Sequence, residues 1–593
     1  MSKATAVNSR TIAQYAVDLV AALGSTHVFT LTGGMAMHIN RAVAIHPQLR
    51  AVYCQHEQAC VAAAEGYSKA SNFRKAGFAV VTAGPGASNT ITSLISAYGD
   101  STPVIVLAGQ IKTADIDSYG TRTHGIQEVK SRELISPCVK DFVRLNTDEY
   151  KTQLSAACRT AFEGRPGPVF IEIPLDVQGF PIDYSSEDIA IAARGILFDS
   201  LKPRYEVAGT YSLGAAFWSL LKARRPLLYV GNGVRVSGQE VVVGSFAERH
   251  NIPMVFSWLS FDIVPSTHRL HFGCPGGLAP IYANQLLGRA DVIVFLGARL
   301  DLGTTAFQRD IFGAQAQRFI VDVDSAELAK FVNMPETMIV KADLRNLLEL
   351  TAELDGQDSQ ADPDWLPWNS QTRADYFAQE RARLESDKFN VYAVASVLSE
   401  LSAGKVFVSA SSGYAEETFT RFFAPGSDTR FFNGAALGAM GMGLPNAIGA
   451  AFGTSAPVVC LEADGGLMLN LQELATLSHY APQGFVLYIF NNAGYESIRS
   501  SQARHFGDVY GADAQSGLFI PDYAEVAKAF KLTYVRIDNV DELKAFTQAH
   551  RPTAPPVVVD LHVEKFEYRG PSVKTVMDAQ GRPSTTPLME IDW

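Results

Sequence analysis

The chain has 593 residues, of which 47% are hydrophobic and 19% are charged, and its formal net charge is -11. This length exceeds what one hydrophobic core supports, so we expect several domains. The acidic balance, with its lysines and arginines scattered, excludes nucleic acid and anionic membrane surfaces as the main partners. Neither a membrane-length apolar run nor a signal-peptide pattern is found, and the six cysteines show no CxxC spacing. We therefore predict a cytoplasmic protein with reduced, buried thiols.

Two polar or proline-bearing stretches divide the chain, near residues 176–195 and 355–370. They predict three domains over residues 1–185, 200–350 and 375–570, followed by a C-terminal tail over residues 571–593. In each domain short apolar runs alternate with longer segments at helical spacing, and the clearest runs lie at residues 78–84, 102–109, 225–233, 290–299, 456–466 and 484–492. Continuous apolar strands are typical of parallel sheets covered on both faces. The predicted fold class is α/β, with three doubly wound parallel-sheet domains.

The first domain contains an alanine-rich segment, residues 53–70, that predicts a helix beginning near Glu57. A carboxylate at that position is favoured by the helix dipole, so Glu57 taken alone has a structural interpretation. Asn89, in "GPGASN", also has a structural interpretation, because asparagine is a common helix cap. His56, beside Glu57, is interpreted as structural.

The central domain is rich in glycine at the ends of its apolar runs, in residues 230–238 and 272–307. Missing side chains there would let the backbone approach a dinucleotide pyrophosphate. Neither stretch matches the GxGxxG fingerprint, and turns explain the glycines equally well. Arg299 is the strongest candidate for a charged ligand contact, and its alternative role is a surface salt bridge.

The third domain places Asp464 at the end of one apolar run and Asn491-Asn492 at the end of the next. The intervening segment predicts a helix over residues 470–480, with Asn470 as N-cap and Glu473 three residues later. A right-handed crossover would make the two strands parallel, so these side chains would share one sheet edge. One carboxylate and one amide oxygen suit Mg²⁺, and the Gly465-Gly466 pair leaves room for phosphate. The alternative is an ordinary pair of turns without a ligand.

Five segments, taken in order, resemble the acetolactate synthase branch of the thiamine diphosphate (ThDP) enzymes. They are residues 53–70, 82–98, 123–129, 434–451 and 463–498. The last resembles the family's GDG…NN signature, with Ala463 in place of the first glycine. The resemblance spans nearly the whole chain and implies a pyrimidine-binding domain, a central Rossmann-like domain and a diphosphate-binding domain, in that order.

The resemblance also implies roles for individual residues. Mg²⁺ would be held by Asp464, Asn492 and the backbone of Gly494. Glu57 would be the glutamate that exchanges a proton with the cofactor's aminopyrimidine, Gln127 an active-site glutamine, and Met440 the bulky residue that bends the cofactor; Met440 could otherwise be a core methionine. The ThDP-binding set is Gly34, Asn89, Gly413, Gly438, Met440, Gly465, Gly466 and Gly494.

A second cofactor, FAD, is implied by the central domain, whose spacing is similar to that of flavin-binding acetolactate synthases. The matching residues are Gly231, Asn284, Arg299, Asp301 and Asp322. The resemblance further implies that ThDP lies between the first domain of one subunit and the third domain of another. A homodimer would then be the smallest active unit, and a homotetramer is expected.

Three positions depart from the family pattern: Thr32 replaces a proline, Ile126 a phenylalanine, and Ser501 a tryptophan. We predict a carboligase that decarboxylates pyruvate, a 2-oxo acid, and transfers the two-carbon acetyl unit to an aldehyde or ketone, including a bulky ketone or deoxyketosugar. The alternatives are acetolactate synthase itself, a lyase or hydrolase that cleaves a carbon-carbon bond in a diketone, and a non-catalytic regulatory relative. A simple decarboxylase is disfavoured because no His-His pair occurs; His124 is the nearest candidate acid-base.

Overall fold

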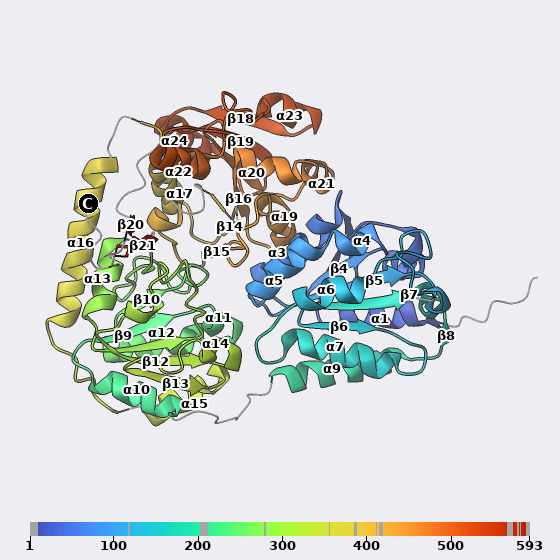
Figure 1. Ribbon diagram of the computed structural model, residues 1–593, viewed down its shortest axis with the longest axis horizontal. Helices are drawn as coiled ribbons and strands as arrows, with labels where there is room; N and C mark the ends of the chain where they lie inside the picture. Colours follow the sequence, from blue (N-terminus) through green and yellow to red (C-terminus); the bar gives the residue numbers. More distant parts are fainter. Residues whose placement is uncertain are drawn as a thin grey trace, which may run out of the picture.

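The protein is described by a computed structural model, drawn in Figure 1. It describes residues 10–116, 119–201, 211–277, 280–354, 356–384, 388–410, 412–413, 419–565, 573–577, 580–581, 583–586 and 588. Three α/β bodies follow one another along the chain, coloured blue to cyan, green, and brown to red in Figure 1. None of the described helices is long and apolar enough to cross a membrane.

The first body is built on a parallel six-stranded sheet within residues 27–174. Its strand order is β3 (Arg50–Tyr53), β2 (His27–Thr30), β4 (Gly77–Val81), β5 (Val104–Gln110), β7 (Val169–Pro174) and β6 (Asp141–Arg144). Along β4, Phe78 and Val80 join one hydrophobic cluster while Ala79 and Val81 join another. Alternate side chains of a strand point to opposite faces, so the sheet is covered on both sides.

The other two bodies repeat this plan. The central sheet has the order β10 (Met254–Phe256), β9 (Pro226–Val230), β11 (Val292–Leu296), β12 (Gln317–Asp322) and β13 (Thr337–Lys341). The third sheet has the order β15 (Arg430–Phe432), β14 (Val406–Ser409), β16 (Val458–Ala463), β17 (Val486–Asn491), β19 (Val557–His562) and β18 (Thr533–Ile537). All pairings within them are parallel. The predicted fold class is confirmed.

Helices cover both faces of each sheet (Figure 1). The first body has α1 (Ile12–Ala22), α2 (Met37–Ile45), α3 (Glu57–Ala70), α4 (Pro85–Ser88), α5 (Ile91–Gly99), α7 (Tyr150–Phe162) and α9 (Ser186–Leu201). The central body has α10 (Leu213–Lys222), α11 (Gly233–Val236), α12 (Glu240–His250), α13 (Ile281–Arg289) and α15 (Leu347–Glu353). The third has α17 (Val391–Glu400), α19 (Gly443–Gly453), α20 (Asp464–Leu467), α21 (Glu473–Tyr480), α22 (Glu496–Phe506), α23 (Tyr523–Ala529) and α24 (Val540–Ala549).

Two segments join the central body to its neighbours. Helix α16 (Trp365–Leu384) runs beside the central body toward the third one (Figure 1), and the Trp365 indole donates to the Pro226 carbonyl at 2.9 Å. The predicted tail region forms an antiparallel pair, β20 (Thr575–Met577) and β21 (Pro583–Thr585). Thr585 Oγ1 donates to the Ala306 carbonyl at 3.0 Å, so these strands pack on the central body.

One local prediction is wrong. Asn470 does not cap a helix: it ends a short 3-10 turn, and α21 begins at Glu473 with Gln472 as its cap residue. Asn470 Nδ2 instead donates to the Gly441 carbonyl at 2.8 Å. The match to the capping pattern is a coincidence. In the fold, the buried Asn470 side chain makes a tertiary hydrogen bond instead of capping the helix. By contrast, all six cysteines are free thiols as predicted, and all but the half-buried Cys274 are buried.

The first and third bodies meet through α3 and α19, which lie side by side in Figure 1. A Cβ built on Gly66 would lie 1.9 Å from the Asn446 carbonyl oxygen, and one on Gly449 would lie 1.8 Å from the Ala63 carbonyl oxygen. Only glycine allows backbones to approach this closely. The resemblance implies that this contact forms between subunits; in the structure it forms within one chain.

We expect Gly449→Ala to destabilise the protein by about 1–3 kcal/mol, because the added methyl group overpacks a backbone contact. The matched control is Gly195→Ala in the exposed part of α9, where a Cβ meets nothing within 4 Å and should stabilise the helix slightly. Thermal melting of both variants gives the comparison. Equal melting temperatures would contradict the close contact.

Candidate active site

Asp464 lies at the carboxyl end of β16, fully buried, as the sequence predicts for a metal ligand. Its Oδ1 accepts from the Gly465 backbone N-H at 2.7 Å and its Oδ2 from the Gly494 N-H at 2.9 Å. Burial raises the pKa of Asp464 to about 7, while these two donors and Arg499 act in the opposite direction. The protein alone therefore does not fully compensate the buried carboxylate, and a cation would.

Asn492 follows the neighbouring strand β17 and lies at the same edge. Its side chain is buried, and its Oδ1 has no hydrogen-bond partner. A buried amide oxygen without a partner is costly, which makes Asn492 a fitting oxygen ligand for a hard cation. Within the described part of the chain no group of three His, Cys, Asp or Glu side chains could hold a metal, so this edge offers one carboxylate with amide and backbone oxygens. Such a sparse set suits Mg²⁺ completed by water and phosphate.

Gly465 and Gly466 open α20 directly after Asp464, as expected for a diphosphate site. A Cβ on Gly465 would lie 2.2 Å from Cε1 of Tyr495, and one on Gly441 would lie 2.9 Å from the Gly466 carbonyl oxygen. The bond from Asn470 to Gly441 closes this arrangement. The loop that carries Gly438 and Met440 is therefore held directly against the predicted diphosphate segment. Met440 itself is half-buried.

Glu57 is the first residue of α3 and is buried. Its Oε2 accepts from Asn89 Nδ2 at 3.0 Å, and His56 caps the helix by accepting from the Gln58 N-H at 3.1 Å. His56 is thus structural, as predicted. Asn89 ends the short helix α4 as its C-cap residue, but its side chain is used to orient the Glu57 carboxylate. The sequence suggested a helix cap or a ThDP contact for Asn89, and neither of these roles includes a hydrogen bond to Glu57.

Another predicted residue, Gln127, lies near the carboxyl edge of the first sheet. Gln127 has a positive φ of 65°, and a Cβ on Gly84 would lie 2.8 Å from its Cα. The neighbouring Gly86 lies near Glu57, because its built Cβ is 3.7 Å from Glu57 Oε1. The structure thus brings the exposed Gln127 to the turn that faces Glu57.

The remaining two ThDP-binding candidates, Gly34 and Gly413, both have open space beside their backbones. Gly34 is exposed in a 3-10 turn at the end of β2, where a Cβ would meet nothing within 4 Å. Gly413 has a positive φ of 92°, also with open space beside it. Open space beside the backbone suits cofactor contact.

The first and third bodies form this site together. Gln58 Nε2 lies 3.7 Å from Met442 Sδ, and Ser93 Oγ, which donates to the Gln58 carbonyl at 2.7 Å, lies 4.0 Å from the same sulfur. On the other side of α3, the Gln55 N-H donates to Glu473 Oε1 at 2.9 Å. Glu57 therefore lies next to the segment that leads from Met440 into α19.

The predicted flavin-binding residues make structural contacts within the central body. A Cβ on Gly231 would lie 2.2 Å from the Gly297 carbonyl oxygen, so this glycine allows β9 and β11 to end in close contact. Asn284 is buried and exchanges two hydrogen bonds with the Gly276 backbone, at 2.8 and 3.0 Å. Asp301 accepts from the Thr304 N-H at 2.8 Å, and burial raises the pKa of Asp322 to about 6.

Arg299 is more than a surface ion pair. It pairs with Asp301 at 2.7 Å and also donates to the Gly99 carbonyl of the first body at 3.2 Å. It lines a cavity of about 670 Å³ between the first and central bodies, together with Tyr98, Arg165, Ser325 and Lys341. Arg165 is paired there with Asp324 and Glu327. The cavity is large enough for a cofactor-sized ligand.

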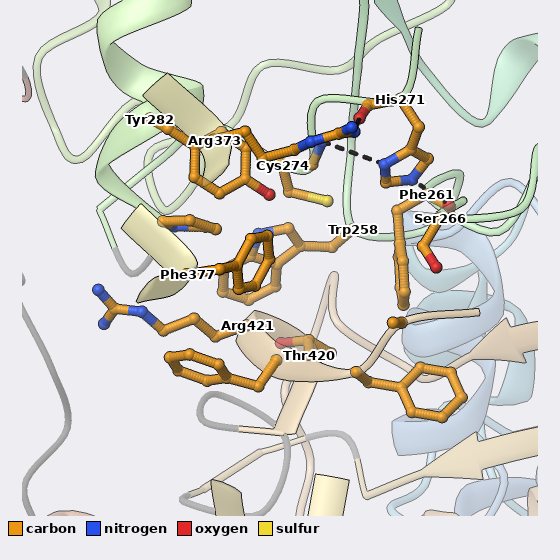
Figure 2. Close-up of a pocket in the computed structure, with 15 residues that line it drawn as sticks. Trp258, Phe261, Ser266, His271, Cys274, Tyr282, Arg373, Phe377, Thr420 and Arg421 are labelled. Carbon is orange, nitrogen blue, oxygen red and sulfur yellow. Dashed lines mark hydrogen bonds between the residues drawn. The ribbon is translucent and has the colours of Figure 1, made fainter. Parts of the chain in front are cut away.

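A second cavity, of about 190 Å³, lies where the central body, α16 and residues 420–424 meet. Figure 2 shows Trp258 and Phe377 in its middle, with Arg373 beside His271. Arg373 donates to the His271 carbonyl at 2.5 Å, and burial lowers the pKa of His271 to about 4. The predicted flavin residues do not line this cavity.

Several residues of the site were not anticipated from sequence. Tyr523 donates its hydroxyl to the Asp464 carbonyl, and Arg499, fully buried, donates to the Asn492 carbonyl at 3.0 Å. Glu462 is buried beneath the Met440 loop and accepts from the Leu444 N-H at 3.1 Å. Glu462 could have been found from the sequence, because a glutamate inside an apolar strand is unusual. Tyr523 lies far from Asp464 in the sequence, and no sequence pattern pointed to it.

The fold and the site fit an enzyme that uses a diphosphate cofactor. Three family models match the chain: the thiamine pyrophosphate enzyme N-terminal TPP binding domain over residues 10–134, the central domain over 213–350 and the C-terminal TPP binding domain over 411–561. Together they span more than half of its length. The chain belongs to the thiamine pyrophosphate enzymes, as an acetolactate synthase-like member of this transferase and carboligase family.

Its relatives are similar over almost the whole chain. Acetolactate synthase 1, chloroplastic, of Zea mays is 27% identical over 95% of the chain and 88% of the relative. Acetolactate synthase isozyme 3 large subunit of Escherichia coli is 29% identical over 88% and 89%. The acetolactate synthase large subunit of Haemophilus influenzae is 27% identical over 92% and 93%.

The chemistry of the site follows from its groups. When bound, ThDP supplies a carbon nucleophile that attacks carbonyl compounds. Asp464, Asn492 and the Gly494 backbone would hold its cation, and the bare backbone of Gly465 and Gly466 would face its diphosphate. Glu57, held by Asn89, would exchange a proton with the aminopyrimidine, because a buried carboxyl in a fixed position is suited to acid-base work. Met440 would pack against the cofactor.

We expect Asp464→Ala to abolish Mg²⁺-dependent retention of ThDP, since it removes the one carboxylate at the sheet edge. Calorimetric titration with ThDP at fixed Mg²⁺ checks this. The control is Asp513→Ala: Asp513 is a half-buried acid next to Gly494 in the fold, and its side chain accepts hydrogen bonds from Ser516 within its own turn. Unchanged ThDP affinity in Asp464→Ala would remove Asp464 from the metal site.

Proposed function

We propose that the protein is a ThDP-dependent carboligase that decarboxylates pyruvate and transfers the two-carbon acetyl unit to an aldehyde or ketone. The observation that carries the proposal is the buried Glu57 carboxylate, oriented by Asn89 at 3.0 Å beside the segment that leads from Met440. The names of the relatives, all acetolactate synthases, support a 2-oxo acid as donor and a carbonyl compound as acceptor.

We infer further that the acceptor is bulkier than a 2-oxo acid, such as a bulky ketone or a deoxyketosugar. Ser501 lies on the exposed side of α22, the helix that follows the metal-binding edge, and Thr32 and Ile126 are also exposed. A serine in place of an indole removes most of an aromatic side chain's roughly 150–250 Å² of contact surface. The entrance beside α22 is thereby widened.

Ser501→Trp should reduce transfer to bulky ketones at least about tenfold more than it reduces pyruvate consumption, because it narrows the acceptor entrance and leaves the cofactor residues unchanged. The matched control, Ser501→Ala, keeps a small side chain and should leave both rates unchanged. Products from pyruvate with small and bulky carbonyl acceptors are separated by chromatography and identified by mass.

The same product analysis decides between the alternatives. Acetolactate as the single product with every acceptor would make the protein an acetolactate synthase. Cleavage of a cyclic diketone without carboligation would make it a carbon-carbon lyase or hydrolase. Equal losses on small and bulky acceptors in Ser501→Trp would remove the acceptor proposal but not the carboligase activity.

We also propose that the protein binds FAD, in the cavity between the first and central bodies. Arg299 and Arg165 give this cavity two guanidinium groups suited to a pyrophosphate, and Ser325, which follows β12 and its last residue Asp322, also lines the cavity. The purified protein should be yellow, with flavin released on denaturation, and Arg299→Ala should lose flavin without losing Mg²⁺-dependent ThDP binding. A colourless, fully active protein would contradict this.

We propose that the active unit is a homodimer, and that the protein assembles as a homotetramer, in which the contact of α3 with α19 is exchanged between subunits. Exchange of identical elements between two copies preserves every bond of the contact seen within one chain. Random mixing of refolded Glu57→Gln and Asp464→Ala subunits, each inactive alone, should then restore about a quarter of the activity, because about half of the dimers are mixed and each mixed dimer has one intact site of two. Light scattering gives the particle mass; no restoration in mixed dimers would place the site within one chain.

We place the protein in the cytoplasm, because its six free cysteines suit a reducing compartment. Burial raises the pKa of thiols such as Cys158 to about 12, which keeps them unreactive. Cell fractionation tests the location.

A further inference from the structure

Six buried charged side chains from all three bodies converge around β15 and the residues that follow it. Three are basic and three are acidic: Lys69, Arg235, Arg430, Glu65, Asp100 and Asp262, each at most 7% exposed. We call this set the buried charge network. It lies immediately before the loop that carries Gly438 and Met440, although no residue of the network belongs to that loop.

The first body contributes half of the network. Lys69 of α3 lies 2.7 Å from both Glu65 Oε1 and Asp100 Oδ2. The same ammonium group donates to the Asn433 carbonyl at 2.6 Å, and Asp100 Oδ1 accepts from the Ala436 N-H at 3.2 Å. Two points of the 433–436 segment are therefore bonded to the first body by buried charges.

The central body contributes Asp262 and Arg235, and the third body contributes Arg430 of β15. Asp262 Oδ1 accepts from Arg235 at 2.7 Å, and its Oδ2 accepts from Arg430 at 3.1 Å and from the Phe431 N-H at 2.8 Å. Arg430 Nε also reaches the Lys69 carbonyl at 3.4 Å, which links the two halves. Strand β15 is thus held to the central body just before the 433–436 segment is held to the first.

Burying this many charges has a large desolvation cost, and apolar residues would stabilise the interface at least as well. Burial alone would raise the pKa of Asp262, but Arg235 and Arg430 hold it below its usual value. Burial also raises the pKa of Glu65, so Asp100 is the better position at which to test the pairing with Lys69. Directional charged bonds, unlike apolar packing, impose one defined geometry.

We propose that the buried charge network is a positioning device for the active site. It holds β15 to the central body and residues 433–436 to the first body. Asn470 and Glu462 hold the far end of the loop, at Gly441 and Leu444, to the third body. The Met440 side chain is thereby placed relative to Glu57. The link to Met440 rests on the proposed function; the holding of the segment does not.

The test uses Asp100→Asn, which keeps the size of the side chain and removes its charge. Hydrogen exchange in residues 433–441 of the cofactor-free protein should become at least about tenfold faster. ThDP affinity at fixed Mg²⁺ should change less than about threefold, because Asp464 and Asn492 lie outside the network. Turnover should fall about tenfold with little change in KM, and the near-ultraviolet circular dichroism of bound ThDP should decrease.

Asp262→Asn, which enters the network from the central body, should show the same pattern and serves if Asp100→Asn does not fold. The matched control is Asp343→Asn: Asp343 is equally buried but pairs with Arg345, away from β15. The proposal would be overturned if hydrogen exchange in residues 433–441 of Asp100→Asn were no faster than in Asp343→Asn. It would also be overturned if the wild-type protein exchanged there as fast as in the exposed residues 119–127. Loss of ThDP affinity in step with turnover would also overturn it. A wild-type chain that binds no ThDP would refute the proposed function instead, and the exchange result would still decide the inference.

Discussion

The site depends on the close packing of α3 against α19. At this contact Gly66 and Gly449 place the backbones of two helices from different bodies so near that no side chain fits between them. Glu57 begins α3, and the segment from Met440 leads into α19, so the same contact that joins the bodies also positions Glu57 relative to the loop that carries Met440. A change of helix spacing would move both groups at once.

The third body brings the candidate metal ligands together in a different way. Parallel strands β16 and β17 end together, which brings Asp464 and Asn492 to one place without any contact between distant segments. Burial there raises the pKa of Asp464, and the Asn492 side-chain oxygen has no hydrogen-bond partner. A site that is incomplete in this way is prepared for a cation, because the cation removes both costs.

Sequence reasoning succeeded where the pattern is local. The apolar runs predicted the strands, and one crossover length predicted that Asp464 and Asn492 share an edge. It failed at Asn470, whose capping pattern was overridden by a bond to Gly441, and it did not anticipate that Asn89 orients Glu57. Both side chains are short polar groups that satisfy local and distant partners equally well, so only the distant partner's position decides their role.

The sequence by itself determined three α/β bodies, the family, and the sheet edge that Asp464 and Asn492 share. These depend on periodicity and on motifs that lie within one β-α-β unit. The tertiary structure alone decided how the bodies join, where Arg299 and Arg165 line a shared cavity, and how Lys69, Asp100 and Asp262 meet around β15. Such contacts join residues that are far apart in the sequence. The periodicity of a single sequence does not encode which two buried charges will pair.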